Sequence, residues 1–340
     1  MAKILVTGGT GYIGSHTVVA LHEAGHQVLI VDDLSNSDVR ILDQLEKIIG
    51  LRPEFEQLDL CQEDAVKAFV AKHSDIDGLI HFAAFKAVGE SVAQPIKYYR
   101  NNFFSLINVL TSFNFNLKLV FSSSCTVYGQ PDSLPVKEDA PVKQAESPYG
   151  NTKQIAEEML AEQVQVSEHL KVVVLRYFNP VGAHESALIG ELPNGVPQNL
   201  VPFITQSAIG KRGAITVYGD DYQTPDGSAI RDYIHVMDLA EAHVAALERL
   251  LTNQVNGYEV FNVGTGKGSS VLEIIQAFEK ATGVNLNYTI GARRPGDIEK
   301  TYGDVQKANQ VLGWQAKRDL LEMMRSAWAW ENYIHANPFS

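Results

Sequence analysis

The sequence has little cysteine, a deficit of positive charge and no long hydrophobic run. Its two cysteines, Cys61 and Cys125, cannot build a disulfide framework, which is typical of a reducing compartment. No apolar stretch approaches the roughly 20 residues that a membrane-spanning helix needs. The N-terminal residues lack the basic region and small-residue cleavage site of a signal peptide. A soluble, cytoplasmic protein is therefore expected.

Basic residues are outnumbered, since 28 Lys and Arg against 40 Asp and Glu give a net charge of −12. This balance argues against nucleic acid or an anionic membrane as a partner, and it is ordinary for a surface whose acidity serves solubility. With 340 residues, 45% of them hydrophobic, the chain can form one elaborated domain or two.

Short runs of Val, Ile and Leu alternate with amphipathic stretches through the first half. Buried strands are expected at residues 4–7, 28–32, 55–59, 79–83, 119–123 and 172–177, with crossover helices between them. This alternation predicts an α/β fold with a doubly wound parallel sheet. After residue 180 the loops become rich in Gly and Pro and the elements shorter, with helices near 237–251 and 320–330. We therefore expect a larger unit over residues 1–180 and a smaller α/β lobe over 181–340, with elements interleaved near the boundary.

A glycine-rich segment, T-G-G-T-G-Y-I-G, occupies residues 7–14, after the first predicted strand and at the start of a helix. Such a turn lets backbone N–H groups approach a pyrophosphate at the positive end of the helix dipole. Asp32 ends the second strand, where a carboxylate can bind an adenosine ribose and repels a 2′-phosphate. Because no arginine follows closely, NAD is favoured over NADP. Asp59, after the third strand, either hydrogen-bonds the adenine or forms a turn. Residues 1–180 are thus expected to be an NAD-binding Rossmann domain.

Tyr149 and Lys153 are four residues apart, so on a helix they share one face. Ser147 and Pro148 fit the N-cap and the first position of that helix. A nearby ammonium favours the phenolate form of a tyrosine, whose reference pKa is about 10, although such a pair alone is common on helices. Ser124 ends the fifth strand, either as a cap or as a functional group at the carboxyl edge of the sheet, where ligands bind. The pattern predicts that these groups converge on a nicotinamide.

One metal-binding pattern is present, because residues 22–26 read H-E-A-G-H. Zinc binding by this pattern needs both histidines on one uninterrupted helical face. Gly25 is expected to end the first helix, so no metal site is predicted.

The chain resembles the extended short-chain dehydrogenase/reductases, in particular those that epimerise UDP-hexoses at C4, over nearly its whole length. The matching segments are T-G-G-T-G-Y-I-G-S-H from Thr7, F-K-A-V-G-E-S-V from Phe85, S-S-S-C-T-V-Y-G from Ser122, S-P-Y-G-N-T-K from Ser147, L-R-Y-F-N-P-V-G-A-H from Leu175, R-D-Y-I-H-V-M-D-L-A from Arg231 and R-R-P-G-D from Arg293. The tyrosine–lysine segment marks the superfamily, whereas the last three segments are much more specific. The resemblance implies interconversion of UDP-glucose and UDP-galactose with tightly held NAD.

The resemblance also implies roles for individual residues. Tyr149 would take the proton of the sugar 4-hydroxyl, Lys153 would lower the pKa of Tyr149 and hold the nicotinamide ribose, and Ser124 would hydrogen-bond the reacting oxygen. The 4-keto sugar would then turn over and take the hydride back on its other face. Positions matching cofactor contacts are Gly8, Gly11, Tyr12, Ile13, Gly14, Asp32, Asp33, Leu34, Ser35, Asn36, Ser37, Asp59, Leu60, Phe82, Ala83, Ala84, Phe85, Lys86, Asn101, Ser124, Tyr149, Lys153 and Phe178. Positions matching UDP-sugar contacts are Ser124, Tyr149, Asn179, Asn199, Leu200, Thr216, Val217, Tyr218, Arg231, Arg294, Asp297 and Thr301.

Side-chain chemistry supports part of the substrate assignment. Arg231 and Arg294 suit a pyrophosphate, because guanidinium binds phosphate bidentately and stays charged, although surface ion pairing is the alternative for each. Tyr218 could stack on a flat base and Asp297 could accept from ribose hydroxyls. Thr301 departs from the family's pattern. A bulky tyrosine there is associated with restriction to plain hexoses, so a second substrate pair, UDP-GlcNAc and UDP-GalNAc, is expected.

Two other functions are compatible with the fold. A nucleotide-sugar 4,6-dehydratase usually has an Asp-Glu pair just after the strand-five serine or threonine, where this chain has Cys125 and Thr126, so elimination is disfavoured. A non-catalytic NAD-sensing protein typically loses the tyrosine or the lysine, and this chain keeps both. The family commonly dimerises through paired helices, and the helices near 95–115 and 148–166 are the candidates for a homodimer.

Overall fold

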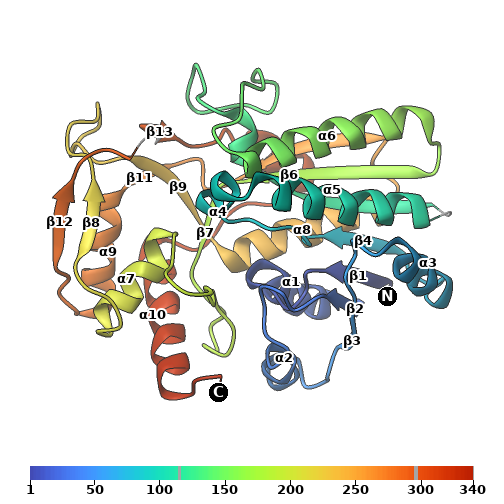
Figure 1. Ribbon diagram of the computed structural model, residues 1–340, viewed down its shortest axis with the longest axis horizontal. Helices are drawn as coiled ribbons and strands as arrows, with labels where there is room; N and C mark the ends of the chain where they lie inside the picture. Colours follow the sequence, from blue (N-terminus) through green and yellow to red (C-terminus); the bar gives the residue numbers. More distant parts are fainter. Residues whose placement is uncertain (114–115, 295–297, 340) are drawn as a thin grey trace.

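The computed structural model describes residues 1–113, 116–294 and 298–339, and within these ranges no helix is long and apolar enough to cross a membrane. At its centre lies a seven-stranded parallel sheet with the strand order β10-β6-β5-β4-β1-β2-β3 (Figure 1). Six of the strands are those that the sequence predicts, namely β1 (Lys3–Thr7), β2 (Gln27–Asp32), β3 (Glu54–Gln57), β4 (Gly78–His81), β5 (Leu117–Ser124) and β6 (Leu170–Tyr177). The predicted doubly wound α/β fold is thereby confirmed.

Helices cover both faces of this sheet because successive strand residues point to opposite sides. Ile4 and Val6 of β1 belong to one apolar cluster, and Leu5 between them belongs to another. The first cluster also holds residues of α1 (Tyr12–Glu23), α2 (Ile41–Ile49) and α8 (Val236–Leu251). The second holds residues of α3 (Glu63–Lys72), α5 (Pro95–Ser112) and α6 (Pro148–Val166). A short helix, α4 (Val88–Ala93), precedes α5.

The seventh strand comes from the second half of the chain. β10 (Tyr258–Val263) pairs with β6 along its whole length, from Tyr258 opposite Val172 to Val263 opposite Tyr177. Sequence reasoning placed the strands of the large sheet before residue 180 and did not assign this one. The division of the chain at residue 180 therefore stays a proposal about folding units, because the large sheet contains residues from both sides of it.

The smaller lobe is built around short strands. β7 (Asn179–Val181), β9 (Ile230–His235), β11 (Gly268–Ser270) and β13 (Lys300–Thr301) form one sheet, and β8 (Ile215–Tyr218) pairs with β12 (Tyr288–Gly291) in another. The helices α7 (Leu200–Ala208), α9 (Val271–Thr282) and α10 (Leu320–Ala336) pack against them (Figure 1). Predicted helices near 237–251 and 320–330 correspond to α8 and α10.

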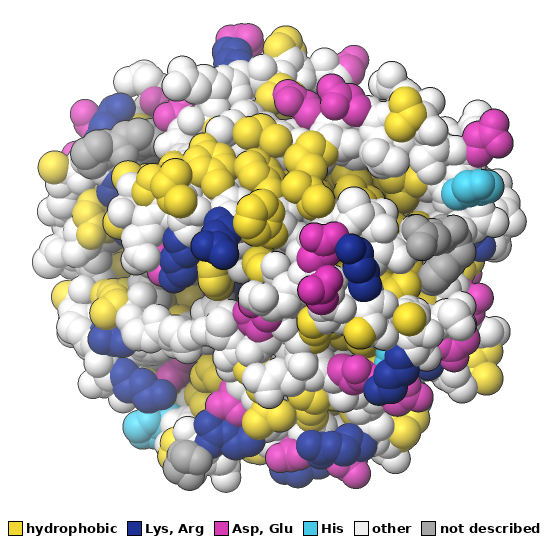
Figure 2. All heavy atoms as spheres, turned by 45° about the vertical axis from the view of Figure 1, so that its right-hand side comes forward, with side chains coloured by type: hydrophobic (Ala, Val, Ile, Leu, Met, Phe, Trp, Pro, Cys, Tyr) yellow, Lys and Arg dark blue, Asp and Glu magenta, His cyan; other side chains and the backbone are white. Residues whose placement is uncertain are grey.

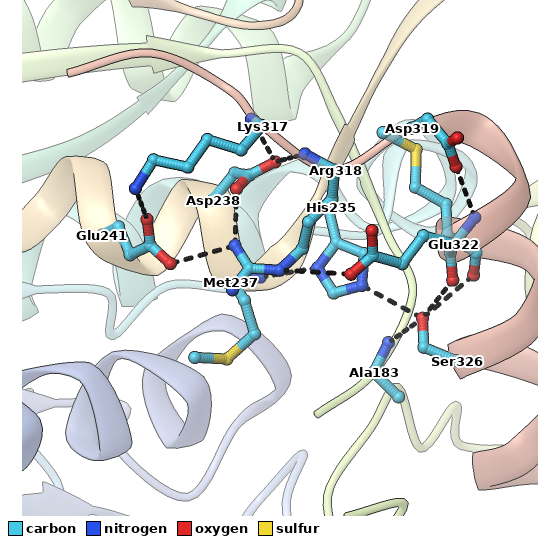
Figure 3. A network of polar contacts seen from close by, with 11 residues as sticks. Ala183, His235, Met237, Asp238, Glu241, Lys317, Arg318, Asp319, Glu322 and Ser326 are labelled. Atoms are coloured by element: carbon cyan, nitrogen blue, oxygen red, sulfur yellow. Dashed lines mark hydrogen bonds and ion pairs between the residues drawn. The ribbon is translucent and has the colours of Figure 1, made fainter. Parts of the chain in front are cut away.

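A polar network ties α8 to the segment that leads into α10 (Figure 3). Asp238, which is fully buried, accepts from Nη1 of Arg318 at 2.5 Å and from the backbone N–H groups of Lys317 and Arg318 at 3.1 and 3.0 Å. His235 caps α8 by accepting from the N–H of Met237 at 3.1 Å, and its other ring nitrogen lies 3.0 Å from Oγ of Ser326 on α10. These contacts fix the C-terminal helix against the large sheet's layer.

The first helix ends where the sequence indicates. α1 stops at Glu23, and Gly25 adopts a φ of +83°, the left-handed conformation of a helix terminator. His22 and His26 therefore do not share a helical face. Nε2 of His26 instead lies 2.7 Å from a carboxylate oxygen of Glu248 on α8.

Candidate active site

The glycines of the turn between β1 and α1 leave little room for a Cβ atom. Gly8 has a φ of +71°, and Gly11, the N-cap of α1, donates its N–H to the Gly8 carbonyl oxygen at 3.1 Å. A Cβ atom at Gly14 would lie only 2.2 Å from that same oxygen. The first N–H groups of α1 receive no side-chain cap, so they remain available to an anion at the positive end of the helix dipole. This cradle fits the pyrophosphate of a dinucleotide.

Asp32, at the end of β2, faces this turn. Its carboxylate is buried and accepts from the backbone N–H of Thr10 at 3.2 Å, the backbone N–H of Leu34 at 3.0 Å and Oγ of Ser37 at 2.9 Å. The next carboxylate, Asp33, accepts from the backbone N–H of Ser35 at 2.9 Å. The acidic group expected at a ribose is thus held beside the glycine turn.

Asp59 makes the contacts of a turn. It accepts from the backbone N–H of Cys61 at 2.8 Å and from Nε2 of Gln62 at 3.0 Å. Burial raises the pKa of Asp59, but these hydrogen bonds outweigh it and leave the pKa below its usual value. The turn-forming alternative is observed, and a role toward adenine stays a prediction.

The residues after β4 are joined to α5 and α6 by Asn102, which sequence reasoning did not single out. Oδ1 of Asn102 accepts from the backbone N–H of Phe85 at 2.9 Å, and its Nδ2 donates to Oγ1 of Thr152 on α6 at 3.0 Å. The neighbouring predicted residue, Asn101, donates to Asn102 at 3.1 Å. The Asn-Asn pair was the only signal in the sequence for this link. It places residues 82–86 next to the helix that carries Tyr149.

Tyr149 lies in the first turn of α6, as predicted. Ser147 is the N-cap and accepts from the backbone N–H of Gly150 at 3.1 Å, and Pro148 follows at the first helical position. The Tyr149 side chain is buried, and this burial raises its pKa well above its usual value of about 10. A hydrogen bond with Ser124 acts in the opposite direction. The two predicted groups therefore meet.

Lys153 points to the end of β5. Its Nζ donates to the carbonyl oxygen of Ser122 at 2.7 Å and lies 4.8 Å from the ring centroid of Phe121. Burial lowers the pKa of Lys153 to about 8, opposed by the negative charge of Glu157. Burial is the largest influence on the Tyr149 phenol and raises its pKa, and a lowering of that pKa by Lys153 stays a prediction.

Ser124 ends β5 and also caps the short 3₁₀ turn Cys125–Tyr128, whose Thr126 donates its backbone N–H to Oγ of Ser124 at 3.2 Å. Both readings of this residue, strand-end cap and partner of Tyr149, are therefore compatible with its contacts. Burial raises the pKa of the adjacent Cys125 thiol to about 12, which makes it an unreactive thiol at neutral pH.

Apart from Ser124 and Tyr149, the positions expected to contact a UDP-sugar lie on or near the strands and helices of the smaller lobe. Arg231 on β9 and Thr301 on β13 are paired in register, and Thr301 is buried. Arg294 stacks on the Tyr218 ring, with its guanidinium carbon 4.0 Å from the ring centroid. Thr216 and Val217 lie with Tyr218 on β8, Asn179 begins β7, and Leu200 begins α7. Asp297 lies outside the described residues.

Asn199 and Lys86 share a partner. Asn199, the N-cap of α7, donates from Nδ2 to Oε1 of Glu191 at 2.8 Å, and Nζ of Lys86 lies 3.5 Å from the same oxygen. Lys86 also lies 5.6 Å from the ring centroid of Tyr12, whose hydroxyl donates to the Gly182 carbonyl oxygen at 2.7 Å. Glu191 thus links the cofactor side and the substrate side of the predicted site.

This parallel sheet, with a glycine turn after its first strand and a Ser-Tyr-Lys group at its fifth, defines an extended short-chain dehydrogenase/reductase. The family model described as GDP-mannose 4,6 dehydratase matches residues 5–327. The UDP-glucose 4-epimerase of Neisseria meningitidis serogroup B is 49% identical over 332 residues, covering 97% of each chain. The chain belongs to the UDP-glucose 4-epimerase family.

Solved structures give the same result. The UDP-glucose 4-epimerase of Stenotrophomonas maltophila, with bound NAD and formylated UDP-arabinopyranose, superimposes with a TM-score of 0.95 at 45% identity, covering 99% of this chain and 100% of that one. The epimerase of Bifidobacterium longum, in complex with NAD+ and UDP, superimposes with a TM-score of 0.92 at 44% identity, covering 98% of both chains.

Proposed function

We propose that this chain interconverts UDP-glucose and UDP-galactose by reversible oxidation at C4. The observation that carries the proposal is the convergence of Ser124, Tyr149 and Lys153 at the carboxyl end of β5, together with the glycine cradle that follows β1 in the same parallel sheet. NAD, when bound, supplies the acceptor and then the donor of the C4 hydride. The net reaction consumes no oxidant, since the same hydride and proton are removed and returned.

Tyr149 is the proton acceptor in this scheme. Burial keeps its phenol protonated at neutral pH, so a nearby cation must stabilise the phenolate as the sugar hydroxyl loses its proton. Lys153 lies one helical turn further along the same face, and a pKa of about 8 leaves it mostly cationic at pH 7. Ser124 donates to the oxygen on which charge develops. Returning the hydride to the other face of the 4-keto sugar inverts C4.

A proton NMR time course of purified protein with UDP-galactose, without added cofactor, tests this proposal. Conversion to UDP-glucose is expected, and no conversion even with added NAD would overturn it. Tyr149→Phe should retain NAD and lose turnover, because only the hydroxyl is removed. Tyr333→Phe is the matched control, since that hydroxyl lies on α10 and contacts Gln44 at 3.1 Å. If Tyr149→Phe turned over like the wild type, the proton-transfer role would be wrong.

The same site is proposed to accept N-acetylhexosamine substrates. Thr301 has a small side chain in a buried position paired in register with Arg231, so it leaves more room in the proposed sugar site than a tyrosine would. Wild-type protein should convert UDP-GalNAc to UDP-GlcNAc, and Thr301→Tyr should lose this activity while converting UDP-galactose at a similar rate. No turnover of UDP-GalNAc under conditions in which UDP-galactose reacts would contradict the assignment.

The proposed assembly is a homodimer in the cytoplasm. Helices α5 and α6 pack side by side, and Ile96 and Phe104, eight residues apart on α5, are 75% and 45% exposed. Figure 2 shows hydrophobic side chains gathered in a band across one face. A second copy would cover them, and Ile96→Asp should weaken association. A sedimentation mass near 37 kDa for the wild type would refute the dimer.

The cytoplasmic location is supported by two free cysteines.

A further inference from the structure

Three consecutive serines at the end of β5 each contact a different turn of α6. In this serine run (residues 122–124), the last serine opposes the rise in the pKa of Tyr149, and the carbonyl oxygen of the first accepts from Lys153 at 2.7 Å. The hydroxyl of the middle serine donates to Oε1 of Glu157 at 2.5 Å. Tyr149, Lys153 and Glu157 are spaced by four, so they line one face of the helix. Glu157, which accepts from the middle serine, is not one of the predicted catalytic residues.

Glu157 is held from the other side by Arg176 on β6. Nε of Arg176 lies 3.0 Å from both carboxylate oxygens, and Nη2 donates to Oε2 at 2.6 Å. Nη1 is occupied by the hydroxyl of Tyr128 and the backbone carbonyl of Glu138, both at 3.1 Å. The charged side chains are only 7% and 8% exposed. The carboxylate is therefore fixed by bonds from two neighbouring strands.

A buried ion pair of this kind is a poor source of stability. The desolvation of two charges offsets their attraction, and apolar residues of similar volume often serve as well or better. Directional bidentate bonds do, however, fix the position of one element against another. We therefore attribute to the pair a role in positioning α6, because its carboxylate lies one helical turn after Lys153.

We propose that Glu157 is a positioning residue of the active site, whose carboxylate, clamped between Arg176 and the middle serine of the run, fixes α6 against the end of β5. This inference rests on the proposed function. It deepens that function by assigning the placement of Tyr149 and Lys153 to a residue that touches neither substrate nor cofactor.

The charge of Glu157 also belongs to the electrostatics of Lys153. The other groups that face the lysine are Tyr149 on its own helix and His81 on β4, whose pKa is lowered by burial and by Lys153 to about 3, so that it is neutral at pH 7. Tyr177 on β6 faces Tyr149 and has a pKa raised by burial to about 12. Glu157 is thus the anionic group of the set at neutral pH, and it favours the protonated lysine.

The test is Glu157→Gln, which keeps the shape and removes the charge. Its kcat for UDP-galactose should fall at least tenfold while KM changes less than twofold, because all the predicted substrate contacts except Tyr149 lie on elements other than α6. Bound NAD should be retained. The alkaline limb of the kcat profile should move to lower pH, as Lys153 loses its anionic neighbour. Glu157→Asp, which restores the charge, should recover part of kcat and the position of the limb.

Glu331→Gln is the matched control. Glu331 on α10 is equally buried and accepts from Lys211 at 2.7 Å, away from α6. Its loss should change stability and leave kcat and the pH profile at wild-type values. An independent readout is ¹³C NMR of the Cε atom of Lys153, whose midpoint near pH 8 should fall in Glu157→Gln and stay in Glu331→Gln.

Three results would overturn the positioning role: a kcat within twofold of wild type in Glu157→Gln, an unchanged Lys153 midpoint, or an equal loss of kcat in Glu331→Gln. Failure of the proposed function would look different. The wild type itself would then not epimerise, whereas the Lys153 titration would still report whether Glu157 acts on the lysine.

Discussion

Replacing Gly14 by alanine tests whether the turn is as tightly closed as the structure indicates. The new Cβ would lie 2.2 Å from the Gly8 carbonyl oxygen and 2.8 Å from Cα of Gly9. Favourable contacts of carbon atoms lie at about 3.5–4.0 Å, so the backbone must move by more than about 1 Å. Overpacking of this kind costs about 1–3 kcal/mol, and the upper end applies because both obstacles are backbone. Alanine returns about 1 kcal/mol as a better helix former. A net loss of about 2 kcal/mol is expected.

The loss should be larger in the presence of NAD, because the displaced turn no longer fits the pyrophosphate. Ligand at 100 times its Kd stabilises a protein by about 2.7 kcal/mol, and this increment should be missing from the variant. The assay is urea unfolding followed by circular dichroism, with and without NAD, together with the NAD content of the purified protein. Gly213→Ala is the control, since a Cβ there meets nothing within 4 Å. A Gly14→Ala variant with the wild-type free energy of unfolding and NAD content would refute the reasoning.

Further predictions concern acid stability and two structural contacts. Burial lowers the pKa of both His81 and His235 to about 3. Below about pH 6.5 the unfolded chain binds protons at these histidines while the folded chain does not. The free energy of unfolding should therefore be highest above pH 6.5 and decrease as the pH falls toward 3. Up to about 2 kcal/mol per histidine is lost at pH 5, and equal urea midpoints at pH 7.5 and 5 would contradict this. Asp238→Ala should lower the free energy of unfolding by about 3 kcal/mol. Arg318→Ala should cost less, because the buried Asp238 carboxylate then keeps its two backbone donors. The reverse order in unfolding experiments would argue against the network. Ser270→Ala removes the capping box of α9 and should cost about 1 kcal/mol; an unchanged Tm would exclude a capping contribution.

The parts of the fold that could be predicted from the sequence are those with local signals. The first six strands are short apolar runs between longer amphipathic segments, and the glycine turn, the end of β5 and the start of α6 carry their own residue preferences. β10 has similar alternation, but nothing within Tyr258–Val263 says that its partner is β6. Pairing over that separation depends on the packing of the whole sheet.

The candidate site divides in the same way. The spacing of Tyr149 and Lys153 predicts a shared helical face, but the direction of the Tyr149 pKa depends on burial, which spacing does not report. Glu157 continues that face and could have been noticed by its spacing. Its partner Arg176 could not, because the contact arises only when α6 packs on β6. Positions such as Asn199 came only from the family resemblance, since a lone asparagine before a helix carries no functional signal.

The late position of β10 has a consequence for the nascent chain. A ribosome releases β6 before residues 178–257, so its outer edge waits for a partner while these are added. At about 5–20 residues per second this interval lasts on the order of 4–16 s. The waiting edge is rich in valine and leucine, a composition that invites pairing with other chains. β10 thus completes the large sheet only when about half of residues 181–340 has been made.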